Sequence, residues 1–174
     1  MMEQAICAVA TATGEGGIAI VRASGEGILS IFDKIFRPFR QKEILSHRMM
    51  YGHAVADDGS VLDEVMAVYL SAPNTYTRED MFEIQCHGGG VCAKRVLERL
   101  MELGARIAEP GEFTKRAFLN GRIDLAQAEA VMQLISARSE AAARASVRQL
   151  TGGVSARVRP IMDEITGIMA LIEA

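Results

Sequence analysis

The sequence predicts an α+β protein, in which a mixed β-sheet with covering helices is followed by the α-helices of a second unit. The chain has 174 residues, which allows one full domain and part of another. Up to about residue 122, short segments rich in Val, Ile and Gly alternate with turn signals. The later chain is rich in Ala and has no proline before Pro160. We therefore expect a first domain over residues 1–121 and the first helices of a helical domain over residues 122–174.

Two strands and a helix are expected at the start of the first domain. Residues 5–10 and 17–23 have the composition of strands, and the glycines of the intervening segment 14–17 permit backbone angles that other residues avoid. These two strands are expected to pair or to lie near each other. Apolar residues then recur at three- and four-residue spacing, which predicts a short helix covering one face of the sheet. They are Ile28, Ile31, Phe32, Ile35 and Phe36.

A hairpin and a strand, turn and helix complete the predicted sheet domain. Segments 49–56 and 61–71 flank residues 57–60, whose Asp-Gly step suits a tight hairpin. Segment 81–87 is the next predicted strand, and it is followed by three glycines and a helix that Gly104 ends. Strands that alternate with helices favour a mixed sheet covered by helices.

The second unit is predicted to begin with a long helix, from about Leu125 to Leu150. Asp124 can accept hydrogen bonds from the first turn of this helix, and Gln127 can reciprocate. A second helix, which Pro160 either starts or kinks, runs into Ala174 without a stop signal. Two helices cannot bury an apolar stripe as a bundle does, so they must dock on the first unit, pair with another copy or await further sequence. We favour the last interpretation, a chain cut inside a larger helical domain.

Composition and charge exclude several classes of protein. The net charge is −3 and no run of Lys and Arg forms a tail, so tight, sequence-blind binding to phosphate backbones is not expected of this chain alone. The three cysteines lack Cys-x-x-Cys spacing, which disfavours a disulfide framework and a structural zinc site and suits a reducing compartment. The sequence has neither a basic leader nor an apolar run long enough to span a membrane, so we expect a cytoplasmic protein without a membrane partner.

Short motifs give no catalytic centre. No G-x-x-x-x-G-K-[ST] loop occurs, so the chain alone is not expected to hydrolyse nucleoside triphosphates. Cys86 and His87 could be a nucleophile and its base, but adjacent residues on a strand face opposite sides. In the alternative interpretation, His87 and the glycines after it shape a turn. His47 and His53 lack the spacing of a helical metal-binding pair, so no metal site is expected.

Several longer segments, taken together, resemble a known family. They are AVATATGEGGIAIVR (8–22), APNTYT (72–77), EIQCHGG (83–89), PGEFTKRAFLNGR (110–122) and DLAQAEA (124–130). In this order they resemble the MnmE family, also called TrmE, of tRNA-modification GTPases. The resemblance covers nearly the whole chain. Several long matches in the right order make it specific, whereas a single glycine pair would be a weak signal.

The resemblance implies a fold and an activity for the full-length protein. In this family an N-terminal domain, related to the folate-binding domain of aminomethyltransferases, forms the homodimer and binds a tetrahydrofolate derivative, either 5-formyl- or 5,10-methylene-tetrahydrofolate. A helical domain follows, and the GTPase domain is inserted within it. Together with the FAD-dependent partner MnmG, the enzyme installs an aminomethyl or carboxymethylaminomethyl group at carbon 5 of the wobble uridine of certain tRNAs. GTP, magnesium and potassium would bind to the GTPase domain outside this chain, which alone is not expected to be catalytic.

The same resemblance implies three folate-binding residues, Arg22, Glu83 and Arg122. A carboxylate such as Glu83 can accept two hydrogen bonds from the amidine-like edge of a pterin, and the two arginines offer planar donor forks to ligand oxygens. Position 122 is often lysine in the family, and the arginine at this position keeps the positive charge. The alternative is that all three are ordinary surface charges, with ion pairs worth under ~1 kcal/mol. Weaker candidates for the pocket wall are Asn74, Tyr76 and His87.

Three functional hypotheses follow. The chain is the folate-binding and dimerising module of a tRNA-modifying GTPase, a purely structural dimerisation unit without ligand, or a free-standing one-carbon transferase. The lack of an evident catalytic acid, base or nucleophile disfavours the third hypothesis.

Overall fold

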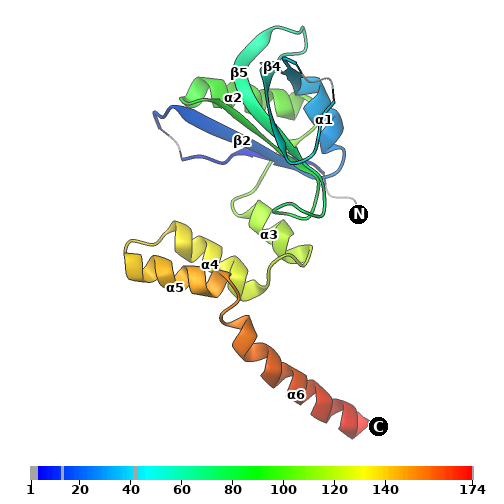
Figure 1. The fold of residues 1–174 in the computed structure, drawn as a ribbon, viewed down its shortest axis with the longest axis vertical. Coiled ribbons are helices and arrows are strands. Elements are labelled where there is room, and N and C mark those ends of the chain that lie inside the picture. Colours follow the sequence, from blue (N-terminus) through cyan, green and yellow to red (C-terminus); the bar gives the residue numbers. More distant parts are fainter. Residues whose placement is uncertain (1–3, 13, 41–42, 174) are drawn as a thin grey trace. The chain divides into compact units, whose positions relative to one another are not determined.

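The computed structural model describes residues 4–12, 14–40 and 43–173, which belong to two compact units (Figure 1). The first unit is Met1–Phe113 and the second is Thr114–Ala174. The first unit contains a sheet and helices, and the second contains helices. The predicted α+β class is therefore confirmed.

The first unit is built on a mixed seven-stranded sheet with the order β3-β4-β5-β6-β2-β1-β7. All neighbouring strands are antiparallel except β1 and β7, which are parallel. The predicted pairing of the first two strands and the predicted hairpin of β4 and β5 are both confirmed. The strands are β1 (Ile6–Val9), β2 (Ile18–Ser24), β3 (Phe36–Pro38), β4 (Arg48–Val55), β5 (Val61–Leu70), β6 (Met81–His87) and β7 (Arg106–Ile107).

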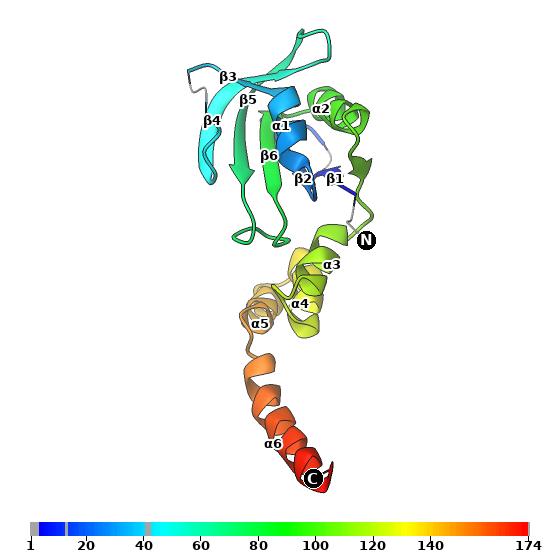
Figure 2. The same ribbon diagram turned by 90° about the vertical axis from the view of Figure 1, so that its right-hand side faces the viewer.

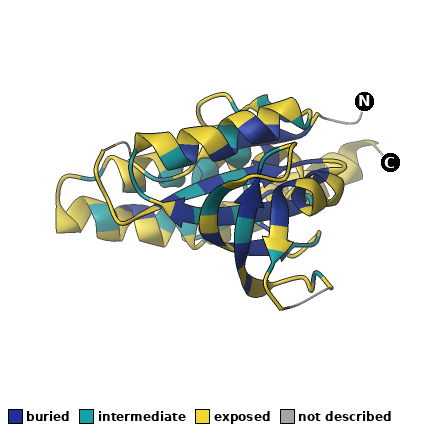
Figure 3. Ribbon diagram, turned by 90° about the horizontal axis from the view of Figure 1, so that it is seen from above, coloured by how far each residue is buried: buried dark blue, intermediate teal, exposed yellow. Residues whose placement is uncertain are grey.

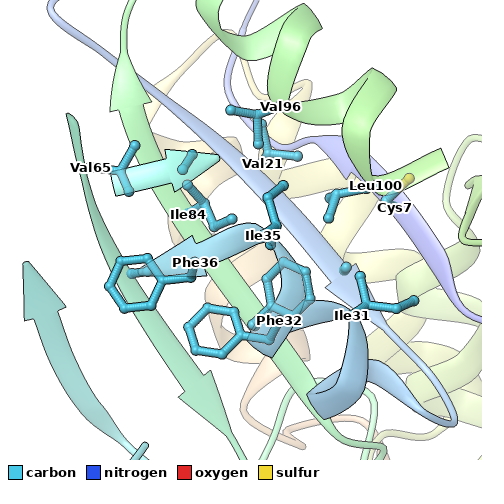
Figure 4. Close-up of a cluster of buried hydrophobic side chains, with 14 of the residues drawn as sticks. Cys7, Val21, Ile31, Phe32, Ile35, Phe36, Val65, Ile84, Val96 and Leu100 are labelled. Atoms are coloured by element: carbon cyan, nitrogen blue, oxygen red, sulfur yellow. The ribbon is translucent and has the colours of Figure 1, made fainter. Parts of the chain in front are cut away.

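Two helices, α1 (Ile28–Ile35) and α2 (Gly90–Glu102), cover one face of this sheet (Figure 2). Their apolar side chains join those of alternate strand residues in one buried cluster, which is seen from close by in Figure 4. Phe32 lies in this cluster, with its ring centroid 5.2 Å from that of Phe36 and 5.0 Å from that of Phe82. Each fully buried side chain of this kind contributes about 1.5–3 kcal/mol relative to an exposed one. The core therefore fixes the sheet that carries the candidate site.

The other face of the sheet carries the alternate residues of the same strands, because side chains along a strand point to opposite sides. On β2 these are Ile18, Ile20 and Arg22, and on β6 they are Glu83 and Gln85. Every one of these five side chains is half-buried or exposed, whereas their neighbours Ala19, Val21, Ile84 and Cys86 are buried. One face of the sheet therefore packs in the core, and the other face is accessible to solvent.

One close backbone contact joins the β1–β2 loop to the end of β6. The Gly88 N–H donates to the Gly17 carbonyl at 3.1 Å. A Cβ atom on Gly88 would lie 1.7 Å from the carbonyl oxygen of Gly16, which is shorter than any non-bonded contact. Glycine is therefore required at this position for the loop to approach the strand end.

The second unit differs from its prediction in one respect, because the expected helix over residues 125–150 is two helices. Ser136 ends the first of them, and Ser139 starts the second by accepting a hydrogen bond from the Ala142 N–H at 3.2 Å. Serine side chains compete for backbone hydrogen bonds and so favour helix ends over helix interiors. The predicted capping box of Asp124 and Gln127 is confirmed, with both hydrogen bonds at 2.9 Å.

The helices of this part of the chain are α3 (Glu112–Leu119), α4 (Leu125–Ile135), α5 (Glu140–Leu150) and α6 (Ser155–Glu173). Helices α4 and α5 are joined by two reciprocal hydrogen bonds of 2.8 Å, from the Gln127 side chain to the Leu150 carbonyl and from the Gln149 side chain to the Ala126 carbonyl. Pro160 lies inside α6 and does not start it. Figure 3 shows that buried residues concentrate in the strands, whereas much of the helical surface is exposed.

Candidate functional site

Arg22 and Glu83 form the centre of the candidate site. They lie directly opposite each other on the antiparallel strands β2 and β6. The Arg22 Nε–H donates to Glu83 Oε1 at 2.7 Å, and the two side chains remain 30% and 21% exposed. Cross-strand neighbours of opposite charge stabilise each other. The structure thus brings together two of the three predicted site residues, on the accessible face of the sheet.

Two aromatic rings flank this pair. The guanidinium carbon of Arg22 lies 5.9 Å from the ring centroid of Tyr76 and 5.7 Å from that of Phe113. Both distances are within the range of a cation–π contact. Tyr76 was a weaker candidate from the sequence, whereas Phe113 was missed, although it lies inside the family-like segment 110–122.

Buried polar contacts fix the loop that carries Tyr76. The Ser24 hydroxyl lies 2.7 Å from that of Thr77 and donates to Glu79 Oε2 at 2.8 Å, while the Thr75 hydroxyl donates to the Glu79 carbonyl at 2.6 Å. Ser24, Thr75 and Thr77 are all buried. Because buried hydroxyls are costly to leave unpaired, these bonds hold the loop against the end of β2. The ring of Tyr76 is therefore carried on a rigid support.

A second anchor holds the residue next to Phe113. Glu112 is buried and receives two hydrogen bonds from Arg106, at 2.8 Å from Nη1 and 2.5 Å from Nη2. Its Oε2 also accepts the N–H of Glu109 at 2.8 Å. A bidentate arginine–carboxylate pair has a defined geometry, so it fixes the start of α3 beside the sheet. Phe113 follows directly from this anchor.

Arg122 belongs to the second compact unit. It is exposed, and its backbone N–H donates to the Ala117 carbonyl at 2.8 Å in the turn that follows α3. The structure describes each unit by itself, so it does not join Arg122 to the pair on the sheet. A shared site for all three residues stays a prediction.

The Arg22–Glu83 pair keeps hydrogen-bonding capacity for a ligand. Its one hydrogen bond uses Arg22 Nε and Glu83 Oε1. Among the described residues, no hydrogen bond is made by Glu83 Oε2 or by either terminal nitrogen of Arg22. The site therefore combines an acceptor oxygen, a planar donor fork and two aromatic rings. This combination suits a flat heteroaromatic ligand that carries both donors and acceptors.

Side chains alternate between the two faces of the sheet along β6, so Cys86 is buried and His87 is exposed. They therefore do not form a nucleophile and its base. Cys86 is buried, its thiol donates to the Ala19 carbonyl at 3.4 Å, and burial raises its pKa to about 11. Such a thiol is a poor nucleophile at neutral pH. His87 is exposed and its Nδ1 lies 2.7 Å from Asp63 Oδ1, a contact that raises the pKa of the imidazole above its ordinary value of 6.5.

Asp63 is a partner of His87 that sequence reasoning missed. Its Oδ2 also accepts the His87 N–H at 2.7 Å. Burial opposes ionisation of this carboxyl, but the hydrogen bonds from His87 and from the Glu64 N–H together outweigh burial and lower its pKa below 3.8. The antiparallel pairing of β5 with β6 brings the start of β5 close to the end of β6. A sequence analysis that predicted this pairing and its register would have found the contact.

Comparison with known protein families adds to this geometry. The model described as "GTP-binding protein TrmE N-terminus" matches residues 5–122, and the one described as "MnmE helical domain" matches residues 125–174. This chain belongs to the MnmE (TrmE) family. The family assignment made from sequence segments is thereby confirmed.

Curated members of the MnmE family are similar to this chain over nearly its whole length. Each of the following is named tRNA modification GTPase MnmE. The protein of Finegoldia magna is 47% identical over 173 residues, that of Alkaliphilus oremlandii 49% over 176, and that of Geobacter sulfurreducens 50% over 174. In each case the match covers 99% of this chain and 38% of the relative. The chain therefore spans little more than a third of the length of these relatives.

Two further properties of this MnmE-family chain bear on its chemistry. Within residues 4–12, 14–40 and 43–173, no three His, Cys, Asp or Glu side chains are placed to hold a metal ion together. The helices of the same ranges are all too short or too polar to cross a membrane.

Proposed function

We propose that this chain is the tetrahydrofolate-binding and dimerising module of a tRNA-modifying GTPase. In this proposal GTP, magnesium and potassium bind to another part of the full-length protein. The full-length protein works in the cytoplasm with the FAD-dependent partner MnmG, and together they modify carbon 5 of the wobble uridine of tRNA. Membership of the MnmE family supports the assignment, since the similar relatives are named tRNA modification GTPases.

The observation that carries the folate proposal is the Arg22–Glu83 pair, which is half-buried, has two aromatic rings close to its guanidinium and keeps unused polar atoms. Glu83 would accept hydrogen bonds from the amino and ring N–H groups of a pterin, and Arg22 would donate to ligand oxygens. Tyr76 and Phe113 offer ring faces on which a pterin can stack. When bound, the folate supplies the one-carbon unit for the modification.

Arg122 remains part of the proposal as a third contact. Its guanidinium is permanently charged, so it would pair with a carboxylate or carbonyl oxygen of the folate under all physiological conditions. The chain contributes no acid, base or nucleophile to a reaction here. Its residues bind and orient the folate, and group transfer takes place in the complete assembly.

Dimerisation is supported by exposed apolar side chains on the accessible face of the sheet. Ile18 on β2 is 63% exposed and Met66 on β5 is 38% exposed. Large apolar side chains on one sheet face mark interaction surfaces, and a second copy presents the same face. Light scattering is expected to give about twice 18.8 kDa for this chain, and Ile18→Glu with Met66→Glu is expected to give the monomer mass. A monomer mass for the unmodified chain at high concentration would contradict this part of the proposal.

One alternative has a specific observation in its favour. Because Arg22 and Glu83 are direct cross-strand neighbours, they could serve as a structural ion pair in a dimerisation unit that binds no ligand. This alternative predicts no affinity for folate.

Calorimetric titration with 5-formyl-tetrahydrofolate tests the proposal. We expect saturable binding, and a loss of at least about tenfold in affinity for Glu83→Gln, since a hydrogen bond to a charged group contributes about 1.5–3 kcal/mol. Glu98→Gln is the matched control, because Glu98 is an exposed carboxylate on α2 that pairs with Lys94. Absence of binding heat, or equal affinities for Glu83→Gln and the unmodified chain, would count against the folate site.

A further inference from the structure

Three ring side chains gather at the β3–β4 edge of the sheet. Phe39 directly follows β3, and its N–H donates to the Tyr51 carbonyl at 3.1 Å. The Phe39 ring centroid lies 4.7 Å from that of Tyr51 and 4.5 Å from that of His53. Phe39 and Tyr51 are 49% and 50% exposed. The rings thus order one another while still presenting ring surface to solvent.

The chain around these rings is basic although the protein is acidic. Residues 34–55 contain five Lys and Arg and one Glu, in a chain whose net charge is −3. Arg37, Arg40 and Arg48 are exposed. One acidic side chain, that of Glu64 on β5, accepts a hydrogen bond from the Tyr51 hydroxyl. Basic side chains therefore outnumber acidic ones in the segment that carries the rings.

Two of the three rings, Phe39 and Tyr51, line one hollow together with Arg40 and Arg48. It has a volume of about 570 Å³, and its lining also includes Pro38, Met49 and Met50. This volume is in the range of small-ligand pockets. The lining residues of the hollow come from the ends of β3 and β4. These two strands form one edge of the sheet (Figure 2).

We propose that this surface, the ring-and-arginine patch of Phe39, Arg40, Arg48, Tyr51 and His53, binds an unpaired segment of RNA. A base stacks on the exposed rings, and Arg40 and Arg48, which line the same hollow, contact phosphates of the same segment. Stacking on aromatic rings together with backbone contacts from cationic side chains is the usual way in which proteins hold single-stranded nucleic acids. The choice of RNA rests on the proposed function, in which tRNA is the substrate.

The composition of the patch distinguishes this occupant from others. An apolar protein partner would leave the arginines without counter-charges, and an acidic peptide would leave the rings without stacking partners. A second copy would have to bring acidic side chains to the arginines and apolar surface to the rings, and in a two-fold dimer it must do so in both directions at once. Duplex RNA would satisfy the arginines but present no base faces to the rings. An unpaired RNA segment provides both base faces for the rings and phosphates for the arginines.

Fluorescence anisotropy with a labelled anticodon stem-loop RNA tests the proposal on the whole chain. We expect the stem-loop to bind more tightly than a duplex of the same length. Arg40→Glu with Arg48→Glu is expected to weaken stem-loop binding by at least about tenfold and to flatten its salt dependence, because fewer counterions are released. Phe39→Ala is expected to weaken it by about fivefold or more, because one stacked base contributes about 1–3 kcal/mol.

The control is Lys94→Glu with Arg144→Glu, which changes the net charge equally but alters exposed residues of α2 and α5. Circular dichroism checks that all variants fold. Equal losses in the control and patch variants would overturn the proposal, since bulk charge would then explain binding. No stem-loop binding by the unmodified chain, preference for the duplex, or equally effective competition by poly-glutamate would also overturn it. So would a monomer mass for the patch variants, which would make a second copy the occupant.

The RNA-binding test and the folate-binding test can fail independently. Arg40→Glu with Arg48→Glu is expected to leave the affinity for 5-formyl-tetrahydrofolate unchanged, because neither residue contacts the Arg22–Glu83 pair. Loss of RNA binding with intact folate binding supports the patch. Folate binding by a chain that binds no stem-loop RNA would overturn the patch and leave the folate site standing.

Discussion

The two units of this chain bury their side chains to different extents. The first unit encloses a cluster of more than twenty buried residues between a sheet face and the helices α1 and α2. In the second unit, the only buried residue of α4 is Ala130 and the only one of α5 is Ser146, while the described residues of α6 include no buried one. The first unit is therefore stabilised by tertiary packing. In the second unit, α4, α5 and α6 rely on helix caps and local hydrogen bonds, and further buried residues lie before α4, at Arg116, Ala117 and Ile123.

The difference in burial is largest in α6. This helix carries large apolar side chains that are more than half exposed, namely Ile161, Met162, Ile165, Ile168, Met169, Leu171 and Ile172. An amphipathic or apolar helix gains most of its stability from packing on a partner. The similar relatives are longer than this chain. In the full-length protein, we expect other helices of the same domain to cover this surface.

The largest expected effect is in the core of the first unit. Phe32→Ala is expected to lower the free energy of unfolding by about 3–5 kcal/mol, because it removes a fully buried ring and leaves a cavity. Ile165→Ala, at a position that is 53% exposed, is expected to change it by no more than about 0.5 kcal/mol. Urea denaturation of both variants measures the difference. Similar losses for the two would contradict the contrast between the units.

An intermediate effect is expected at Gly88. Gly88→Ala forces a methyl group against the carbonyl of Gly16, so unfolding should become easier by about 1–3 kcal/mol or more. Gly17→Ala is the matched control, because an added Cβ there meets no atom within 4 Å. Thermal unfolding of the two variants compares them. An unchanged melting temperature for Gly88→Ala would show that the loop does not pack as described.

A smaller effect than at Phe32 or Gly88 is expected at the cap of α4, in the helical unit. Asp124→Ala should cost about 1 kcal/mol, because it removes the hydrogen bond to the Gln127 N–H. A hydrogen bond from Ser155 lowers the pKa of Asp124 below 3.8. The contribution of this carboxylate is therefore present above pH 3.8 and is lost as the pH falls through the lowered pKa. Helix content followed from pH 7 to pH 2 should thus be less pH-dependent in Asp124→Ala, and equal profiles would contradict this role.

Much of the fold was predictable because its signals are local. Residues 81–87 match the bounds of β6, and the Asp-Gly hairpin and the capping box of Asp124 were identified from a few neighbouring residues. The break at residues 136–139 was missed because alanines on both sides continue the helical pattern, while the two serines that end it are weak signals. Strands β3 and β7, of three and two residues, are too short to have a period of their own.

The candidate site was predictable only in part. Arg22 and Glu83 were selected through the family resemblance, and their meeting depends on the register of β2 and β6, which residue patterns alone do not specify. Phe113 and Asp63 were missed because their roles arise from contacts with residues 91 and 24 positions away in the chain. Long-range contacts of this kind need the folded sheet. The place of Arg122 stays a prediction.

The central claim is that Arg22 and Glu83 recognise a folate rather than only each other. Exchanging them, with Arg22→Glu and Glu83→Arg in one variant, keeps an ion pair across the strands but reverses its donors and acceptors. We expect this variant to unfold within about 1 kcal/mol of the unmodified chain, since partly exposed pairs contribute little. Its affinity for 5-formyl-tetrahydrofolate should fall at least about tenfold. A corresponding exchange of Lys94 and Glu98 should change neither property. Unchanged folate affinity after the Arg22–Glu83 exchange would contradict the claim.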